Sequence, residues 1–227
     1  MALDLARISG ICLDVDGTIS DTDNAWTNRL SQILHPLRFL FKGHNPASFA
    51  RWLVMTGGSP ANALYHWLDR MSLDDTIAGL YEKFSRRRNS RASPFLLMDY
   101  APDFLDFAAS LYPVAIVSSR DDESTRQFID QFGLRGYFKA VVTSQTCEHT
   151  KPYADPVLFA AQWMGVAPDR CVMVGDTTVD ILAGKAAGAQ TIGVLCGFGT
   201  RRELEKAGAD LIVKDLMELK KVFEGIG

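Results

Sequence analysis

Two aspartates, Asp14 and Asp16, stand two residues apart where the apolar run 11–13 ends, and Gly17 follows them. Carboxylates this close repel each other unless a cation or a hydrogen-bond donor stabilises them. Residues two apart in an extended strand share a face, although a loop that begins here can turn the second side chain away. Gly17 permits the tight turn that follows. The spacing predicts a charged site at the end of a strand.

Three more stretches carry polar side chains that a phosphate or a metal ion would bind. Asp176 is, like Asp14 and Asp16, a hard oxygen donor of the kind that Mg2+ prefers. Ser118 offers a hydroxyl and Lys151 a positive charge to a phosphate group. The three stretches are Ser118-Ser119-Arg120, Lys151-Pro152 and the run from Gly175 to Asp180.

These stretches follow predicted strands, and each of them also has an ordinary structural explanation. Asp and Thr are good helix N-caps, so the run from Gly175 to Asp180 could simply begin a helix. Paired aspartates can lie in a solvated loop, and a Lys-Pro pair is often only a loop. Together, however, they fall at the carboxyl ends of strands, where open parallel sheets bind their ligands. Asp180, four residues after Asp176, would then support the metal's waters or Lys151.

From residue 94 onward, short β-branched runs alternate with amphipathic stretches, which is typical of βαβ units in a parallel sheet. The run 8–13 supplies one more strand, so the sheet has about six. The other predicted strands are 114–118, 140–143, 171–174, 191–194 and 211–213. The predicted helices are 102–111, 123–132, 155–164, 178–187 and 200–207.

Residues 20–92 differ, because their apolar side chains recur at helical spacing and no strand pattern competes. We expect a helical cap over 20–92, inserted after the first strand of a catalytic core formed by 1–19 and 93–227. Residues 20–98 hold ten Lys and Arg against six Asp and Glu, whereas the whole chain carries a net charge of -3. A basic insert beside an acidic core suits an anionic ligand, and a solvated basic face explains it nearly as well.

The composition of the 227-residue chain argues against several protein classes. A pI near 5.8 gives no basic footprint for nucleic acid. The chain has no apolar stretch of eighteen residues and no pattern of a signal peptide, so we expect a cytoplasmic protein without a membrane partner. The four cysteines form no CxxC pair and are expected to be buried free thiols.

The four motifs together resemble the haloacid dehalogenase-like hydrolase superfamily, in its phosphatase branch with a helical cap. DVDGT matches the first motif, VAIVSS the second, KPYADP the third and GDTTVD the fourth. The resemblance covers nearly all of residues 8–219, and the late segment GFGTRRELEKAGADLIV is similar to that of phosphoglycolate phosphatases. It implies a Rossmann-like α/β core with an inserted cap.

The resemblance also implies a role for each motif residue. Asp14 would be the nucleophile, and Asp16 would protonate the leaving group and then activate water. Mg2+ would be bound by Asp14, Asp176 and the backbone carbonyl of Asp16. Ser118, Ser119 and Lys151 would hold the phosphoryl group, although Ser119 stands where many relatives have Asn. Supporting roles fall to Thr18, Gly175 and Asp180, and Arg120 is a candidate substrate contact.

The expected activity is Mg2+-dependent hydrolysis of a small phosphorylated metabolite. A phosphomutase similar to beta-phosphoglucomutase would use the same aspartates, and a non-catalytic phosphate-binding module would keep them without turnover. A phosphonate-cleaving relative would need a lysine in the cap, where Lys42 and Lys83 are present. The second aspartate of the first motif argues against carbon–halogen cleavage. The sequence leaves open the substrate and whether the protein is a monomer or a homodimer.

Overall fold

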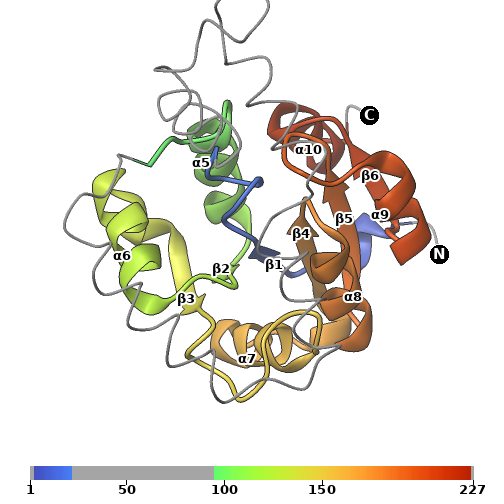
Figure 1. Cartoon of the computed structure of the whole chain (residues 1–227). Coiled ribbons are helices and arrows are strands. Elements are labelled where there is room, and N and C mark those ends of the chain that lie inside the picture. The colour runs from blue at the N-terminus through green and yellow to red at the C-terminus, as the bar shows by residue number, and fades with distance from the viewer. Residues whose placement is uncertain (1–2, 22–94, 226–227) are drawn as a thin grey trace, which may run out of the picture. The chain divides into compact units, whose positions relative to one another are not determined.

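The computed structural model describes residues 3–21 and 95–225, which form a parallel sheet covered by helices (Figure 1). The sheet has six strands in the order β3-β2-β1-β4-β5-β6. This order and the parallel pairing confirm the predicted Rossmann-like α/β core. The strands are β1 (Gly10–Leu13), β2 (Val114–Val117), β3 (Phe138–Val142), β4 (Cys171–Gly175), β5 (Gln190–Val194) and β6 (Leu211–Val213).

The helices lie on the two faces of this sheet. α7 and α8 contact each other and the strands beneath them, whereas α5 and α10 contact each other on the opposite face (Figure 1). The α-helices are α5 (Ala101–Leu111), α6 (Asp122–Gln131), α7 (Asp155–Met164), α8 (Thr178–Ala186), α9 (Arg201–Ala207) and α10 (Leu216–Phe223). Single 3₁₀ turns are η1 (Leu5–Arg7), η5 (Leu134–Tyr137) and η6 (Pro168–Arg170).

The central strands are buried on both faces, which explains their almost continuous apolar sequences. Every residue of β1, β2, β4 and β5 is buried. The edge strand β3 instead alternates between partly buried and exposed residues until Val142. The sheet core therefore fixes the ends of β1, β2 and β4 firmly, and the predicted motif residues follow those ends.

The element predictions agree with the structure to within about two residues at most boundaries. All six strands and five of the helices were expected, whereas α10 was not. Its start carries a readable signal, because the Asp215 side chain accepts a hydrogen bond of 2.9 Å from the backbone N–H of Glu218. The Phe223 ring then packs against Phe104 of α5, with centroids 6.5 Å apart.

The chain turns back on itself between β1 and β4. It runs outward from β1 to β2 and β3, and then returns to place β4 on the other side of β1. At such a reversal the loops after the two central strands separate, and open α/β sheets bind ligands in the crevice between them. Asp14 follows β1 and Asp176 follows β4, so this reversal brings the first and fourth motifs side by side.

The chain divides into two units, one formed by Met1–Thr22 with Leu97–Gly227 and the other by Asp23–Leu96. The expected cap, 20–92, lies almost wholly outside the described residues, so its helical character stays a prediction. Of the four cysteines, Cys12 and Cys171 are buried in the sheet as expected, whereas Cys147 and Cys196 are partly exposed. Within 3–21 and 95–225, no helix has the length and apolar character needed to cross a bilayer.

A candidate active site at the carboxyl edge of the sheet

A buried lysine links two carboxylates at the centre of this edge. Lys151, in the loop between β3 and α7, donates from Nζ to Asp14 Oδ1 and to Asp180 Oδ1, both at 2.6 Å. Asp14 is the first residue after β1, and Asp180 lies in the first turn of α8. All three side chains are almost completely shielded from water. Lys151 therefore joins the third motif to the first and the fourth.

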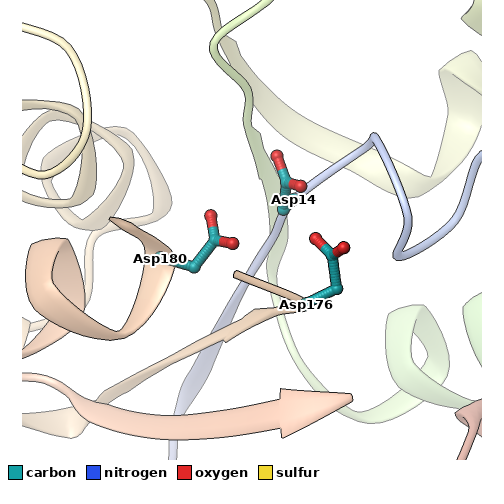
Figure 2. Close-up of side chains that lie close together, drawn as sticks. All are labelled: Asp14, Asp176 and Asp180. Carbon is teal, nitrogen blue, oxygen red and sulfur yellow. The ribbon is translucent and has the colours of Figure 1, made fainter. Parts of the chain in front are cut away.

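Three carboxylates crowd this small buried space. Asp14, Asp176 and Asp180 each offer an oxygen within 4.8 Å of the others, and Figure 2 shows their side chains converging from the ends of β1 and β4 and from α8. Burial and the negative charges of Asp180 and Asp16 raise the pKa of Asp14 to about 7, although Lys151 opposes them. Burial alone would lower the pKa of Lys151, but the carboxylates of Asp14 and Asp180 outweigh it and raise that pKa.

The carboxylate cluster fits a divalent metal ion. If all groups are ionised, the three acids exceed the one lysine by two negative charges. Carboxylate oxygens are hard donors that suit Mg2+, which takes few protein ligands and keeps its remaining positions for water and phosphate oxygens. Burial and, to a smaller extent, the neighbouring carboxylates raise the pKa of Asp14, and a bound divalent cation would offset both effects.

Asp176 is held in place by the loop that follows β5. Its Oδ2 accepts a hydrogen bond of 2.7 Å from the backbone N–H of Phe198. Gly17 and Gly197 press against the same carboxylate, and a Cβ at either position would overlap it. Gly17 also has a φ of +76°, which favours glycine on conformational grounds. Two glycine backbones thus form a close-fitting cradle around Asp176.

Gly197 and Phe198 are not among the site residues predicted from the sequence. The signal was present in the glycine-rich segment GFGT, because glycines allow the backbone to approach another group closely. In the sequence this segment indicates only a similarity to the late segment of phosphoglycolate phosphatases. Its contact with Asp176 depends on the neighbouring positions of β4 and β5 in the sheet, which the sequence of the loop does not reveal.

Asp16 has a separate positive partner. Arg120, beyond the end of β2, donates from Nε to Asp16 Oδ2 at 2.7 Å and from Nη2 to Oδ1 at 2.5 Å. The regular strand β1 ends at Leu13, so the alternation of faces no longer applies between Asp14 and Asp16. The two neighbouring acids consequently bind different cations, Asp14 with Lys151 and Asp16 with Arg120.

The other predicted site residues lie at the same edge with different degrees of burial. Ser118 is buried at the end of β2, and its Oγ accepts a hydrogen bond of 3.1 Å from the backbone N–H of Arg120. Ser119 is exposed. Thr18 is fully buried, and its hydroxyl has no hydrogen-bond partner within the described part of the chain. Gly175 leaves room for Asp180, whose side chain would overlap a Cβ there.

Asp180 takes part both in capping a helix and in the contact with Lys151, the two interpretations offered for the fourth motif. Its Oδ2 accepts hydrogen bonds from the backbone N–H of Thr177 at 3.0 Å and from the Thr177 hydroxyl at 2.7 Å. These bonds stabilise the start of α8, as the capping interpretation expects. Its Oδ1 meanwhile accepts from Lys151. The same carboxylate therefore both caps a helix and orients the lysine.

A groove of about 760 Å³ lies elsewhere, along the edge strand β3. It is lined by Arg126, Arg135, Lys139 and Trp163 among others, and by none of the predicted site residues. Its ionisable groups do not form a buried cluster, whereas the edge beside β1 and β4 gathers several titratable groups away from water. Such clusters are where catalytic chemistry is usually found, so the carboxylate cluster is the better candidate.

Comparison with known protein families gives one extended match. A family model described as haloacid dehalogenase-like hydrolase matches residues 11–194. The match begins within β1 and ends with the last residue of β5, so it includes Asp14, Lys151 and Asp176. It therefore includes the residues of the carboxylate cluster.

Curated relatives match over almost the full length at low identity. A phosphoglycolate phosphatase from Escherichia coli (strain K12) is 24% identical over 229 residues, covering 93% of this chain and 91% of the relative. A pyrophosphatase PpaX from Bacillus velezensis is 26% identical over 217 residues, covering 94% and 95%. These relatives share a hydrolytic activity on phosphate groups by name and differ in the substrate that the name gives.

Solved structures confirm the fold. A predicted phosphatase from Clostridium acetobutylicum superposes with a TM-score of 0.71 at 22% identity, covering 96% of this chain and 99% of the other. A putative beta-phosphoglucomutase from Thermotoga maritima gives a TM-score of 0.69 at 17% identity, covering 97% and 100%. The same fold thus occurs in proteins with different names, so the fold alone does not select an activity.

Proposed function

Since the chain belongs to the haloacid dehalogenase-like hydrolase family, we propose that it is a Mg2+-dependent phosphatase acting through an aspartyl-phosphate on Asp14. The observation that supports this proposal best is that two neighbouring acids, Asp14 and Asp16, lie in different environments. Asp14 is buried against Lys151 inside the carboxylate cluster, whereas Asp16 is partly exposed and bound to Arg120. Two acids in different environments are suited to two different chemical roles.

In the first step, a carboxylate oxygen of Asp14 attacks phosphorus and the bond from phosphorus to the leaving oxygen breaks. Asp16 gives a proton to that oxygen, so the leaving group departs as a neutral alcohol. In the second step, Asp16 takes a proton from water, whose oxygen attacks phosphorus and releases inorganic phosphate. Asp14 is regenerated as a carboxylate, and covalent catalysis has divided one difficult hydrolysis into two easier reactions.

Lys151 and Ser118 would bind the transferred phosphoryl group. Lys151 already holds a carboxylate oxygen of the proposed nucleophile at 2.6 Å, so its ammonium lies where negative charge develops during attack. Asp180 fixes that ammonium from the other side at 2.6 Å. Ser118, buried at the end of β2, would offer its hydroxyl, and the exposed Ser119 would contribute at the rim.

Asp14, Asp176 and the backbone carbonyl of Asp16 would hold the Mg2+, with Asp180 and Thr18 in support. When bound, the ion supplies positive charge that lowers the repulsion between Asp14 and an incoming phosphate. Phe198 and Gly197 keep Asp176 oriented for this role through its Oδ2. The donor set of buried carboxylates supports the proposal.

The proposed substrate is a small phosphorylated metabolite with a single ester-linked phosphate. The names of the relatives make phosphoglycolate and pyrophosphate the first compounds to test. The predicted cap over 20–92 would choose among such compounds and exclude water on closing. A panel of phosphomonoesters together with pyrophosphate, assayed with Mg2+ and read out as released inorganic phosphate, identifies the preferred substrate. Isomerised sugar phosphate without free phosphate would instead indicate a phosphomutase.

The decisive test is Asp14→Asn, which removes the nucleophilic oxygen while keeping the size of the side chain. We expect phosphatase activity with Mg2+ to fall by at least about 10³-fold, because the residual rate depends on binding and electrostatics alone. Asp169→Asn, an exposed acid in η6, is the matched control and should keep full activity. Full activity in Asp14→Asn would contradict the proposal.

A further inference from the structure

The pair between Arg120 and Asp16 has the geometry of a two-point clamp. Nε and Nη2 of Arg120 each donate to a different oxygen of the Asp16 carboxylate, at 2.7 and 2.5 Å. A bidentate pair of this kind fixes the plane of the carboxylate as well as its position. The Arg120 side chain is only 13% exposed and that of Asp16 is 34% exposed, so water weakens this pair less than a pair at the surface.

Arg120 is itself held rigidly. Its backbone N–H donates to Ser118 Oγ at 3.1 Å, and its carbonyl oxygen accepts from the backbone N–H of Ser144 at 2.9 Å. Its guanidinium lies 5.5 Å from the centroid of the Phe128 ring, a distance at which the cation and the ring attract each other. These contacts come from the residue that follows β2, from the loop after β3 and from α6, so three separate segments position the clamp.

The clamp also secures the turn that follows Asp16. Nη2 of Arg120 donates to Ser20 Oγ at 3.2 Å. Within the turn, the carbonyl oxygen of Val15 accepts from the backbone N–H groups of Ile19 at 3.0 Å and Ser20 at 2.8 Å. Arg120 therefore grips both the first and the last residue of the segment 16–20, and that segment cannot rotate without breaking several hydrogen bonds.

We propose that Arg120 is a positioning residue that fixes the carboxyl group of Asp16 for proton transfer to and from the reacting oxygen. Both guanidinium donors bind the ionised form, which takes a proton from water, and one stays bound to the carbonyl oxygen of the protonated form, whose O–H gives its proton to the leaving oxygen. This inference rests on the proposed function, which gives Asp16 that proton transfer. It replaces the substrate contact suggested for Arg120 by its place in the second motif. Nε and Nη2 of Arg120 are directed at Asp16 and Ser20.

The role predicts a dependence on the leaving group. When the bond from phosphorus to the leaving oxygen breaks, an alkoxide needs the Asp16 proton, whereas 4-nitrophenolate departs as a stable anion without it. A misplaced Asp16 should therefore slow alkyl phosphates far more than 4-nitrophenyl phosphate. The ratio kcat/KM covers only the steps up to departure of the leaving group, so it isolates this effect from the later attack of water.

The experiment measures kcat/KM with Mg2+ for 4-nitrophenyl phosphate, phenyl phosphate and the best alkyl phosphate of the substrate panel. In Arg120→Met we expect a loss of about 10²-fold for the alkyl ester and less than about threefold for the nitrophenyl ester. Arg120→Lys restores the charge without the fork and should recover only part of the loss. Arg126→Met, an exposed arginine of α6, is the control and should match the parent on all three substrates.

A uniform loss on all three substrates would overturn the inference, because it would indicate a substrate contact or a general structural role for Arg120. Full recovery in Arg120→Lys would also overturn it, because charge alone would then suffice. Thermal unfolding of each variant shows whether a loss of activity is caused by unfolded protein. If Arg120→Met is unfolded, the three substrates are compared in Arg120→Lys and the parent protein instead.

Asp16→Asn separates this inference from the proposed function. If Asp16 transfers the proton, Asp16→Asn alone shows the same leaving-group dependence, and adding Arg120→Met causes little further loss. If Asp16→Asn shows no such dependence, the proposed role of Asp16 fails. If it shows the dependence and Arg120→Met does not, only the positioning role of Arg120 fails.

Discussion

Asp14 combines two demands that normally exclude each other. A nucleophile must be ionised, yet burial and the nearby charges of Asp180 and Asp16 raise the pKa of this carboxyl group to about 7. Lys151 compensates for only part of this cost, because it is shared with Asp180. A divalent cation would supply the missing positive charge and keep Asp14 ionised.

Protons and Mg2+ should therefore compete for Asp14. Below pH 7 the metal-free Asp14 is mostly protonated, so binding of the ion must displace a proton, and the affinity falls by up to about tenfold per pH unit. Above pH 7 the carboxyl group is already ionised and the affinity levels off. Isothermal titration with Mg2+ at pH 6, 7 and 8 measures this.

Asp14→Asn is the matched variant for this titration, because it cannot take up the proton. Its weaker residual binding of Mg2+ should change little between pH 6 and 8. Equal affinity of the parent protein at pH 6 and pH 8 would contradict the proton competition at Asp14.

Among the elements, the loop after β5 controls the orientation of Asp176. Gly197 has no unusual φ, so its need for glycine comes from space alone: a Cβ would lie 2.5 Å from the carbonyl oxygen of Gly17 and overlap Asp176. Gly197→Ala should weaken Mg2+ binding by about tenfold or more, since displaced residues that orient ligands typically cost 10–100-fold in affinity. Gly136→Ala, where a Cβ meets nothing within 4 Å, is the control.

Titration calorimetry with Mg2+ checks both glycine variants. Unchanged affinity for Mg2+ in Gly197→Ala would contradict the prediction, because it would show that the loop accommodates the Cβ without moving Asp176. A loss in Gly136→Ala of similar size would show that the effect is not local.

A second element-level contact joins α8 to β5 and β6. Asp210 accepts from Lys185 Nζ at 2.5 Å and from the backbone N–H of Thr191 at 2.9 Å. Burial alone would raise the pKa of Asp210, but these hydrogen bonds and the positive charge of Lys185 outweigh it and lower the pKa below its usual 3.8. Asp210→Asn should lower the free energy of unfolding by about 2 kcal/mol at pH 7.

The sign of the pH dependence follows from the lowered pKa of Asp210. The stabilisation is complete above the unfolded value near 3.8 and is lost as the pH falls through the lower folded value. Urea unfolding at pH 7, 5 and 3.5 should give the same difference between parent and variant at pH 7 and 5, and a smaller one at 3.5. Asp169→Asn, which breaks an exposed pair with Arg7, should cost less than about 1 kcal/mol throughout.

At the scale of the whole molecule, a bound metal ion would stabilise the unit that carries the site. An ion at 100 times its Kd adds about 2.7 kcal/mol to the folded state. For a protein of this size that corresponds to a rise in Tm of roughly 5–10 °C. Thermal unfolding of the parent protein with Mg2+ and with a chelator measures the shift.

Asp176→Asn should abolish most of this Mg2+-dependent shift, whereas Asp169→Asn should keep it. If Asp176→Asn shifts as much as the parent protein, the ion binds elsewhere, and the carboxylate cluster is not its site.

Much of the sheet could be predicted from the sequence because burial on both faces leaves a strong local pattern. The apolar runs 114–118, 171–174 and 191–194 each correspond to a strand. Helix α10 was not predicted, although α9, which is one residue shorter, was. Its boundary depends on one capping aspartate and its stability on packing against α5, and only the folded chain brings Phe223 to Phe104.

The sequence by itself determined which residues carry charge, and that the motifs follow strands whose ends meet at one edge. It could not determine which charges become partners, because the partners are 104, 137 and 29 residues apart along the chain. The tertiary structure determines these partners. In the folded chain, Lys151 pairs with Asp14 and Asp180, Arg120 pairs with Asp16, and the backbone N–H of Phe198 donates to Asp176. The physical reason is that strand order, which reverses between β1 and β4, sets the distances between distant charges, whereas local sequence sets only their chemistry.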